Sequence, residues 1–453
     1  MNKYWRTYLF VFATFIFGSA SFGYSAGDPR IAIIGANPEG SKDGKIPSWE
    51  GGLAKQETAE NGHHIDLFSE EKPLFIVNQD NIRDYSNVIP SGTIALLNAY
   101  PETFNIPVYT SHRTTSYPDW YYENTSQRPN THIKENGSTL INAYPGVAFP
   151  TPKTGLEAIW NHLTRWRGQS IDRTFVDAIV YPDGDRQLTK SKQKVSFELF
   201  RYLDPSDWRP RLSDQNRQVL LYYQSLVIEP ARLAGGSLLA IDYVDQHSNP
   251  RKAWAYDVGQ KRVMRMPYIT HDNSALMSES LRTADDTDLF NGSPDRYDWK
   301  LLEKKAMLVP YNAYRVSDPS LRYEQILSPH HINPAVTRFE YHRVWVVEAT
   351  LKAGFQHIYS ARTFYIDEDS WAILQADQYD NKGQIWRVNM CHYKLYYEVP
   401  ANFCAAEVIH DLKRKAYYVS GLTNEERGAG NISAPNPPAS QFTPASLRAG
   451  AKR

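Results

Sequence analysis

Apolar and polar residues alternate along most of the chain after residue 174, which is the pattern of half-buried β-strands. Val195, Phe197 and Leu199, for example, alternate with Ser196 and Glu198. The pattern predicts strands over residues 174–181, 194–202, 218–228, 237–244, 299–309, 338–351, 357–366, 371–378 and 385–397. Short turn-forming segments separate most of them, so neighbouring strands are expected to be antiparallel. A sheet of at least ten strands is expected to curl or close to protect its edges.

Residues 253–268 predict a hairpin with an unusual surface. Trp254 and Tyr256 lie two residues apart and therefore share one face of the first arm. A turn follows at residues 257–260, and the second arm carries Arg262 and Arg265. An aromatic surface beside a cationic one indicates a place where an amphipathic molecule could bind.

The clearest predicted helix covers residues 154–166. Thr154 can cap its N-terminus and Glu157 follows three residues later, as in a capping box. Leu156, Ile159, Trp160 and Leu163 repeat at helical spacing. Two further helical pieces are predicted within residues 78–100, divided by Pro90. Residues 272–294 are expected to form a loop or a helical excursion.

The fold class predicted from these patterns is mainly β (α+β). It consists of a large curved antiparallel sheet or an incomplete barrel, with helices covering its opening. Residues 27–423 are expected to form a single domain. The polar segment 424–453, rich in Pro, Ala and Ser, is expected to be a flexible tail.

Composition excludes some classes of partner. The chain has 50 basic and 50 acidic residues, and this balance argues against a nucleic-acid-binding protein. Aromatic residues make up 13% of the chain, led by 30 Tyr, which suits strands and surfaces that are partly wet and partly apolar.

Residues 1–26 predict a cleaved signal peptide. Lys3 and Arg6 precede an apolar stretch at residues 8–17 that is too short to span a membrane, and small residues follow. An uncleaved anchor is the alternative. In a Gram-negative source the destination would be the periplasm, with a peripheral association at the outer membrane. Cys391 and Cys404 then form either a disulfide or two reduced buried thiols.

Catalytic and metal-binding signatures were not found in the sequence, which has no nucleophile elbow, P-loop or dinucleotide-binding glycine motif. The acidic run 367–369 lacks the periodicity of a calcium loop and is interpreted as a solvated hairpin turn. In the run 341–348, Arg343 and Trp345 share a face that lines either a cavity or ordinary core. No catalytic residue, metal ligand or cofactor is predicted.

Several stretches, taken together and in order, resemble a bacterial family known as domain of unknown function 1329. They are GKIPSWEGG at 44–52, FPTP at 149–152, the hairpin 254–267, FNG at 290–292 with DRYDW at 295–299, VPYN at 309–312, VWVVEAT at 344–350, YIDEDSW at 365–371 and FTPASLR at 442–448. The resemblance implies a periplasmic protein with a fold similar to the outer-membrane lipoprotein carriers. It also implies an outer-membrane protein partner and an inner-membrane exporter of the resistance-nodulation-division type.

The leading hypothesis is a non-catalytic carrier or adaptor that shields a lipid or another hydrophobic small molecule. The predicted apolar contacts are Trp254, Tyr256, Trp345 and Tyr365, and the predicted head-group contacts are Arg262, Arg265 and Arg343. The alternatives are a hydrolase of envelope glycan or lipid, and a structural subunit of an outer-membrane complex that binds no ligand.

Overall fold

The computed structural model describes residues 32–450 except 60–61, 268, 429 and 433. The predicted signal peptide therefore lies outside the described residues. None of the helices in the described part of the chain is long and apolar enough to cross a membrane.

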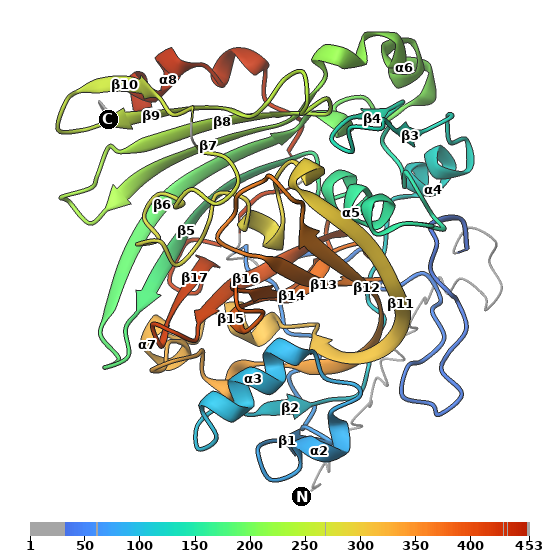
Figure 1. Cartoon of the computed structure of the whole chain (residues 1–453), viewed down its shortest axis with the longest axis vertical. Coiled ribbons are helices and arrows are strands. Elements are labelled where there is room, and N and C mark those ends of the chain that lie inside the picture. The colour runs from blue at the N-terminus through green and yellow to red at the C-terminus, as the bar shows by residue number, and fades with distance from the viewer. Residues whose placement is uncertain (1–31, 60–61, 268, 429, 433, 451–453) are drawn as a thin grey trace, which may run out of the picture.

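One 15-stranded sheet dominates the molecule (Figure 1). Its order is β1 (Phe75–Val77), β2 (Ile106–Val108), β12 (Phe339–Leu351), β13 (Ala361–Asp367), β14 (Ile373–Tyr379), β15 (Ile385–Tyr396), β16 (Ala401–Asp411), β17 (Ala416–Leu422), β5 (Ser170–Val180), β6 (Arg186–Phe197), β7 (Val219–Glu229), β8 (Ser237–Tyr243), β9 (Lys252–Asp257) and β10 (Arg262–Arg265). β11 (Tyr297–Pro310) also pairs with β12. A separate two-stranded sheet joins β3 (His132–Ile133) and β4 (Leu140–Ile141).

The large sheet consists of two antiparallel meanders, β5–β10 and β11–β17, which meet where β17 pairs with β5. The contact between β2 and β12 is parallel, at Val108 and Phe339. The sheet is curved and does not close, since its path ends at β1 on one side and at β10 on the other. The predicted fold class, a large curved and mostly antiparallel sheet with few helices, is confirmed.

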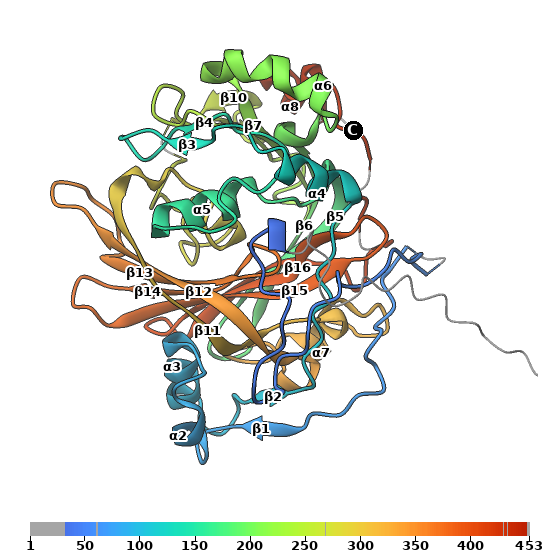
Figure 2. The same cartoon turned by 90° about the vertical axis from the view of Figure 1, so that its right-hand side faces the viewer.

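Helices cover both faces of the second meander (Figure 2). α5 (Gly155–Thr164) begins as predicted, because the Thr154 side chain accepts a hydrogen bond from the Glu157 amide at 3.2 Å. It buries Ile159, Trp160 and Leu163 on one side of the sheet, while α3 (Ser91–Ala99) buries Leu96 and Leu97 against β14 and β15 on the other. The remaining helices are α2 (Ile82–Tyr85), α4 (Asp119–Ser126), α6 (Pro205–Trp208), α7 (Tyr323–Ile326) and α8 (Pro444–Gly450).

Two strands that the sequence did not predict lie where the two meanders join. β16 and β17 were not predicted, and β6 begins at Arg186, eight residues before the predicted start. The first half of β6 reads Arg-Gln-Leu-Thr-Lys-Ser-Lys-Gln and has little apolar alternation. Its Thr189, Ser191 and Gln193 face an internal cavity rather than an apolar core, which explains why hydrophobic periodicity did not indicate the strand.

The interpretation of residues 367–369 as a solvated turn is wrong. Asp367, Glu368 and Asp369 are 0%, 1% and 1% exposed. Arg113 pairs with Asp369 at 2.5 Å and with Glu368 at 3.3 Å, and Lys304 reaches Glu368 at 3.0 Å. These cations come from distant segments, so the sequence near residue 367 gives no sign that the acidic run is buried.

The C-terminal segment, predicted to be a flexible tail, packs against the sheet in the described residues. Phe442 and Leu447 are 3% and 0% exposed and lie in one cluster with Leu239 of β8. The ring of Phe442 stacks on Tyr222 of β7 with ring centres 5.0 Å apart. These two apolar side chains therefore hold the otherwise polar C-terminal segment against the sheet.

Candidate ligand-binding cavity

A cavity of about 520 Å³ lies on the inner side of the first meander. Successive residues of a strand point to opposite faces of the sheet, so alternate positions reach this space. Arg173, Phe175 and Asp177 line it from β5, and Tyr223, Ser225 and Val227 line it from β7. This volume falls within the range of pockets that bind small molecules, about 300–1,000 Å³.

The segment between β10 and β11 folds back over the first meander (Figure 1), and its residues line the cavity on this side. Arg251 anchors this segment, because its guanidinium pairs with Asp242 of β8 at 2.6 Å and also donates to the carbonyl of Asn291 at 2.6 Å. Within the segment, Ser274 and Thr283 form an antiparallel bridge. The cover is therefore a fixed part of the fold and not a loose loop.

Part of the cover has a strained backbone. His271, Met277, Glu279 and Ser280 adopt positive φ angles of 51°, 60°, 46° and 64°. Residues other than Gly and Asn rarely adopt this backbone conformation, which costs on the order of 1–3 kcal/mol per residue. Such strain persists where the surrounding structure fixes a segment in a required position.

The end of the cavity nearest the sheet edge is apolar. Met264 of β10, Met266, Leu276 and Met277 line it. Val258 and Leu276 are 40% and 38% exposed at this end. Exposed apolar side chains around an opening are typical of a path by which an apolar ligand enters.

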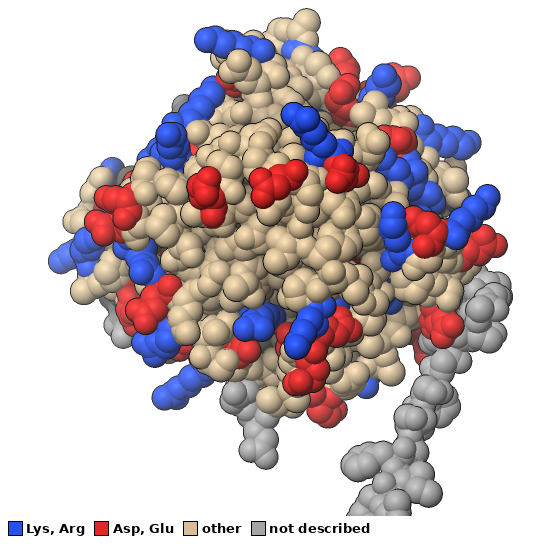
Figure 3. Space-filling view, turned by 90° about the horizontal axis from the view of Figure 1, so that it is seen from below, with Lys and Arg blue, Asp and Glu red and all other residues tan. Residues whose placement is uncertain are grey.

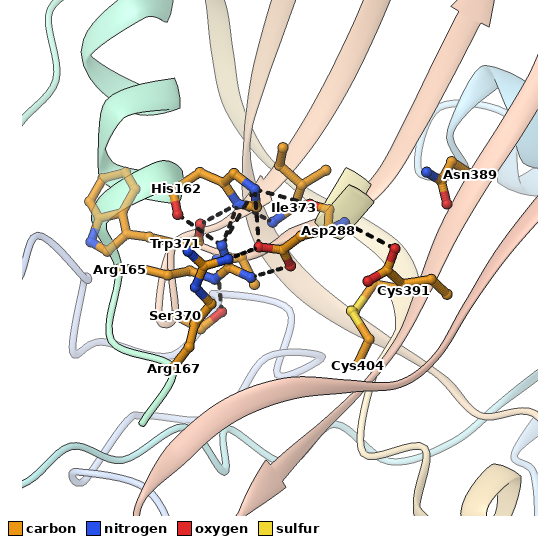
Figure 4. Close-up of a disulfide and its surroundings, with 12 residues drawn as sticks. His162, Arg165, Arg167, Asp288, Ser370, Trp371, Ile373, Asn389, Cys391 and Cys404 are labelled. Carbon is orange, nitrogen blue, oxygen red and sulfur yellow. Dashed lines mark hydrogen bonds and ion pairs between the residues drawn. A yellow bond between two sulfur atoms is a disulfide. The ribbon is translucent and has the colours of Figure 1, made fainter. Parts of the chain in front are cut away.

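The opposite end, where β5 meets β17 and β16, is polar. Arg167 and Asp288 line it, and Arg165 lies next to Asp288 (Figure 4). Arg165 pairs with Asp288 at 2.5 Å, and Arg167 contacts the same carboxylate. Burial by itself would raise the pKa of Asp288, but these two guanidinium groups hold it well below its ordinary value.

Glu407 of β16 and Asp177 of β5 are the other acidic groups at the polar end. Glu407 accepts a hydrogen bond from the Asp288 amide at 3.0 Å. Burial, with the negative charge of Asp288 nearby, raises the pKa of Glu407 to about 7. Burial also raises the pKa of Asp177. Both acids are therefore harder to ionise than in water.

The disulfide predicted between Cys391 and Cys404 is present beside this polar end (Figure 4). It joins β15 to β16, with Cα atoms 5.2 Å apart. Both cysteines belong to the main apolar core. The alternative of two reduced thiols is thus set aside.

Two of the hairpin residues predicted to contact a ligand, Trp254 and Tyr256, pack against the cluster of Leu239, Phe442 and Leu447 under the C-terminal segment. Tyr256 also reaches the rim of the cavity. Arg262 and Arg265 are exposed on β10 and are not among the residues that line the cavity. Their contact with a ligand stays a prediction.

The remaining predicted site residues lie in the second meander, away from the cavity lining. Arg343 pairs with Glu368 at 3.0 Å and donates to the Glu39 carbonyl at 2.7 Å. Trp345 stacks with Trp371 at 6.2 Å between ring centres. Tyr365 donates a hydrogen bond to Asp377 at 3.0 Å. All three side chains contact other residues of the second meander or of the N-terminal segment. Their role in binding a ligand also stays a prediction.

Sequence reasoning did not single out the charged residues of the cavity. Asp177 lies in the predicted strand 174–181 and Arg173 lies one residue before it, and their shared face could have been inferred from Phe175 between them. Arg282 and Asp288 lie in a segment predicted only as a loop or excursion. No local pattern shows that such a segment folds back over a sheet.

Two groups of side chains in the described residues have the spacing of metal ligands. In the first, Asp288 and Glu407 accompany Cys404, whose sulfur is already bonded to Cys391. In the second, His342 and Asp367 accompany Asp369, which Arg113 neutralises. The disulfide and the arginine argue against metal binding in either group, so the cavity is better suited to an organic ligand.

Surface charge adds little to this picture. On the face seen from below, basic and acidic side chains are interspersed, and neither sign forms a continuous patch (Figure 3). This face gives no sign of the cationic stripe that nucleic-acid binding requires.

Comparison with known proteins places the chain in a family. The model of the family described as "Protein of unknown function (DUF1329)" matches residues 76–448. The "Uncharacterized protein PA3922" of Pseudomonas aeruginosa is 39% identical over 427 residues, which cover 92% of this chain and 91% of that protein.

Solved structures are more distantly similar. A DUF1329 family protein from Desulfovibrio piger is 14% identical, with a TM-score of 0.41 over 62% of this chain and 92% of that one. A LolA superfamily protein from Nitrosomonas europaea is 12% identical, with a TM-score of 0.36 over 64% of this chain and 98% of that one. Scores below 0.5 do not decide what the chain binds. The match over most of its length and the close relative establish that this chain belongs to the DUF1329 family.

Proposed function

We propose that this chain is a non-catalytic binding or carrier protein for a lipid or another hydrophobic small molecule in the periplasm. The observation that carries the proposal is the cavity of about 520 Å³, apolar at its open end and polar at its inner end. A cavity of this kind suits a molecule with an apolar chain and a polar head. Each buried methylene contributes about 0.8 kcal/mol, so an acyl chain alone would supply useful affinity.

The cavity favours this function over a structural subunit that binds no ligand. A purely structural protein is expected to fill its interior with its own side chains, to the density of an organic crystal. Here Ala240 and Ala255 line a space that larger residues would fill. The disulfide supports the periplasmic location, because disulfides persist in oxidising compartments.

Filling the cavity tests the proposal. In Ala255→Phe the added ring would occupy the space between β9 and the cover. We expect affinity for a fluorescent fatty acid, measured by titration, to fall about tenfold or more. Ala231→Phe is the control, because Ala231 is exposed in the turn after β7 and is not among the lining residues. Its affinity should match the wild type.

Lipid extraction gives an independent test. Protein purified from the periplasm without detergent should release a lipid detectable by mass spectrometry, and Ala255→Phe should release less. A wild-type protein that is empty and binds no fluorescent fatty acid would overturn the carrier proposal.

The partners implied by the family resemblance belong to this proposal as well. We propose that the protein acts with an outer-membrane protein and an inner-membrane exporter of the resistance-nodulation-division type. Cross-linking in intact cells followed by mass spectrometry of the adducts tests this. If neither class of partner is recovered, the protein binds its ligand without these partners, and this part of the proposal is wrong.

A further inference from the structure

Arg282 extends from the cover into the polar end of the cavity. Its position is fixed by the backbone, because its carbonyl accepts a hydrogen bond from the Ala275 amide at 2.9 Å and its neighbour Thr283 bridges to Ser274. The guanidinium carbon lies 4.9 Å from the centre of the Tyr418 ring. The strained backbone at residues 277–280 immediately precedes it. The cover therefore holds this cation in place over the sheet.

One polar atom of Arg282 lacks a partner. Its Nε is buried and has no hydrogen-bond partner among the residues described. The hydroxyl of Tyr418 and the carboxylate of Asp177, by contrast, interact with each other. Buried polar atoms are hydrogen-bonded in the great majority of cases. The unpaired Nε beside the cavity indicates that a polar group of a ligand completes the site.

Arg173 adds a second cation at the same end. Its Nε donates to Gln193 at 2.7 Å, and its guanidinium carbon lies 4.9 Å from the ring centre of Phe175 and 5.2 Å from that of Phe403. These contacts orient the guanidinium of Arg173. Among the described residues, no carboxylate lies within salt-bridge distance of it.

The charges facing this space are unbalanced. The charge of Asp288 is offset by Arg165 and Arg167. Glu407 and Asp177 are the other acids at this end, whereas Asp242 pairs with Arg251 and Asp257 lies at the far end of β9. Four arginines, at positions 165, 167, 173 and 282, therefore face three acids even with every acid ionised. The guanidinium geometry matches the oxygens of a carboxylate or phosphate.

We propose that Arg282, with Arg173, binds the anionic head group of an amphiphile, a carboxylate or a phosphate, at the inner end of the cavity. This rests on the proposed carrier function and adds to it a ligand class and an orientation. The head lies inside, near β16 and β17. The chain runs toward Met264, Met266 and Leu276 at the open end, where exposed apolar residues would shield it.

The test compares amphiphiles that share a dodecyl chain and differ in the head. Delipidated protein is titrated with dodecanoate, dodecyl phosphate, neutral monododecanoylglycerol and dodecylammonium. We expect either anion to bind at least tenfold more tightly than the neutral ligand, because a charge-assisted hydrogen bond gives a factor of roughly 10–100. The tighter anion identifies the head group.

Substitution localises the effect. Arg282→Met should reduce affinity for the anions about 10- to 100-fold and change affinity for the neutral ligand less than about twofold. Arg186→Met is the matched control, since Arg186 is exposed at the start of β6 outside the cavity lining, and it should keep the wild-type preference. Circular dichroism and thermal unfolding confirm that each variant is folded.

Three results would overturn the inference. They are a wild-type protein that binds anionic and neutral ligands equally, one that prefers dodecylammonium, and a folded Arg282→Met variant that retains the preference for anions. If Arg282→Met does not fold, the wild-type comparison decides. Failure of the wild type to bind any of the four ligands would instead overturn the carrier function itself.

Discussion

Asp377 shows how a single buried group is set by its neighbours. It lies in β14 under the start of α3. Its carboxylate accepts hydrogen bonds from the backbone N–H of Gly92 at 2.8 Å, the side-chain amide of Gln375 at 2.7 Å and the hydroxyl of Tyr365 at 3.0 Å. These bonds favour the charged form, but complete burial outweighs them and raises the pKa to about 6.

Asp377→Asn tests this balance. Because the folded pKa is raised from 3.8, its contribution to stability is complete below pH 3.8 and is lost as pH rises through about 6. The variant, which does not titrate, should gain stability relative to wild type over that window, by about 3 kcal/mol at most. Urea unfolding at pH 4, 5, 6 and 8 measures the difference.

The control is Asp298→Asn, because Asp298 is exposed on β11. Its difference from wild type should be small at every pH. A difference for Asp377→Asn that does not change with pH would contradict the raised pKa.

At the scale of elements, α3 depends on a close approach to the sheet. Gly92 lies in its first turn, and a Cβ atom there would stand 2.1 Å from Asp377 Oδ1 and 2.8 Å from Val388 Cγ1. Helix propensity alone predicts that Ala stabilises a helix by about 1 kcal/mol over Gly. At this position packing opposes propensity.

We therefore expect Gly92→Ala to destabilise the protein by about 1–3 kcal/mol, because the helix or the two strands must shift. Asn98→Ala is the control in the same helix, since Asn98 is exposed and should give a neutral or slightly stabilising change. Denaturant unfolding at pH 8 distinguishes them. If Gly92→Ala instead stabilises the protein, α3 does not pack against β14 and β15 as closely as described.

At the scale of the whole molecule, the two faces of the first meander have different roles. Its inner face borders the cavity, and its outer face is covered by the C-terminal segment through Phe442 and Leu447. Tyr222 stacks on Phe442 outside, and Tyr223, the next residue, lines the cavity inside. The C-terminal segment thus keeps the apolar back of a ligand-binding surface out of water.

Phe442→Ala should lower the free energy of unfolding by about 3–5 kcal/mol, the usual range for removing a buried phenylalanine. It should also make the C-terminal segment more sensitive to proteolysis. Gln441→Ala, at an exposed neighbouring position, should match the wild type in both assays. Equal proteolysis of the two variants would argue that the segment is not attached through Phe442.

The sequence by itself determined the local elements of this protein. The N-terminus of α5 followed from Thr154 and Glu157, and the hairpin of β9 and β10 followed from its turn and alternating arms, because caps and turns depend on neighbours within a few residues. The fold class followed from many such strands. The disulfide was one of two alternatives, since spacing cannot show that two Cβ atoms meet.

Only the tertiary structure decided what the elements do together. Trp254 belongs to the outer face and Arg282 to the cavity, because burial depends on which distant segment lies opposite. The acidic run 367–369 is buried because Arg113 comes from far away in the chain to meet it. Charge compensation and cavities arise from such long-range contacts, and no periodicity along the chain records them.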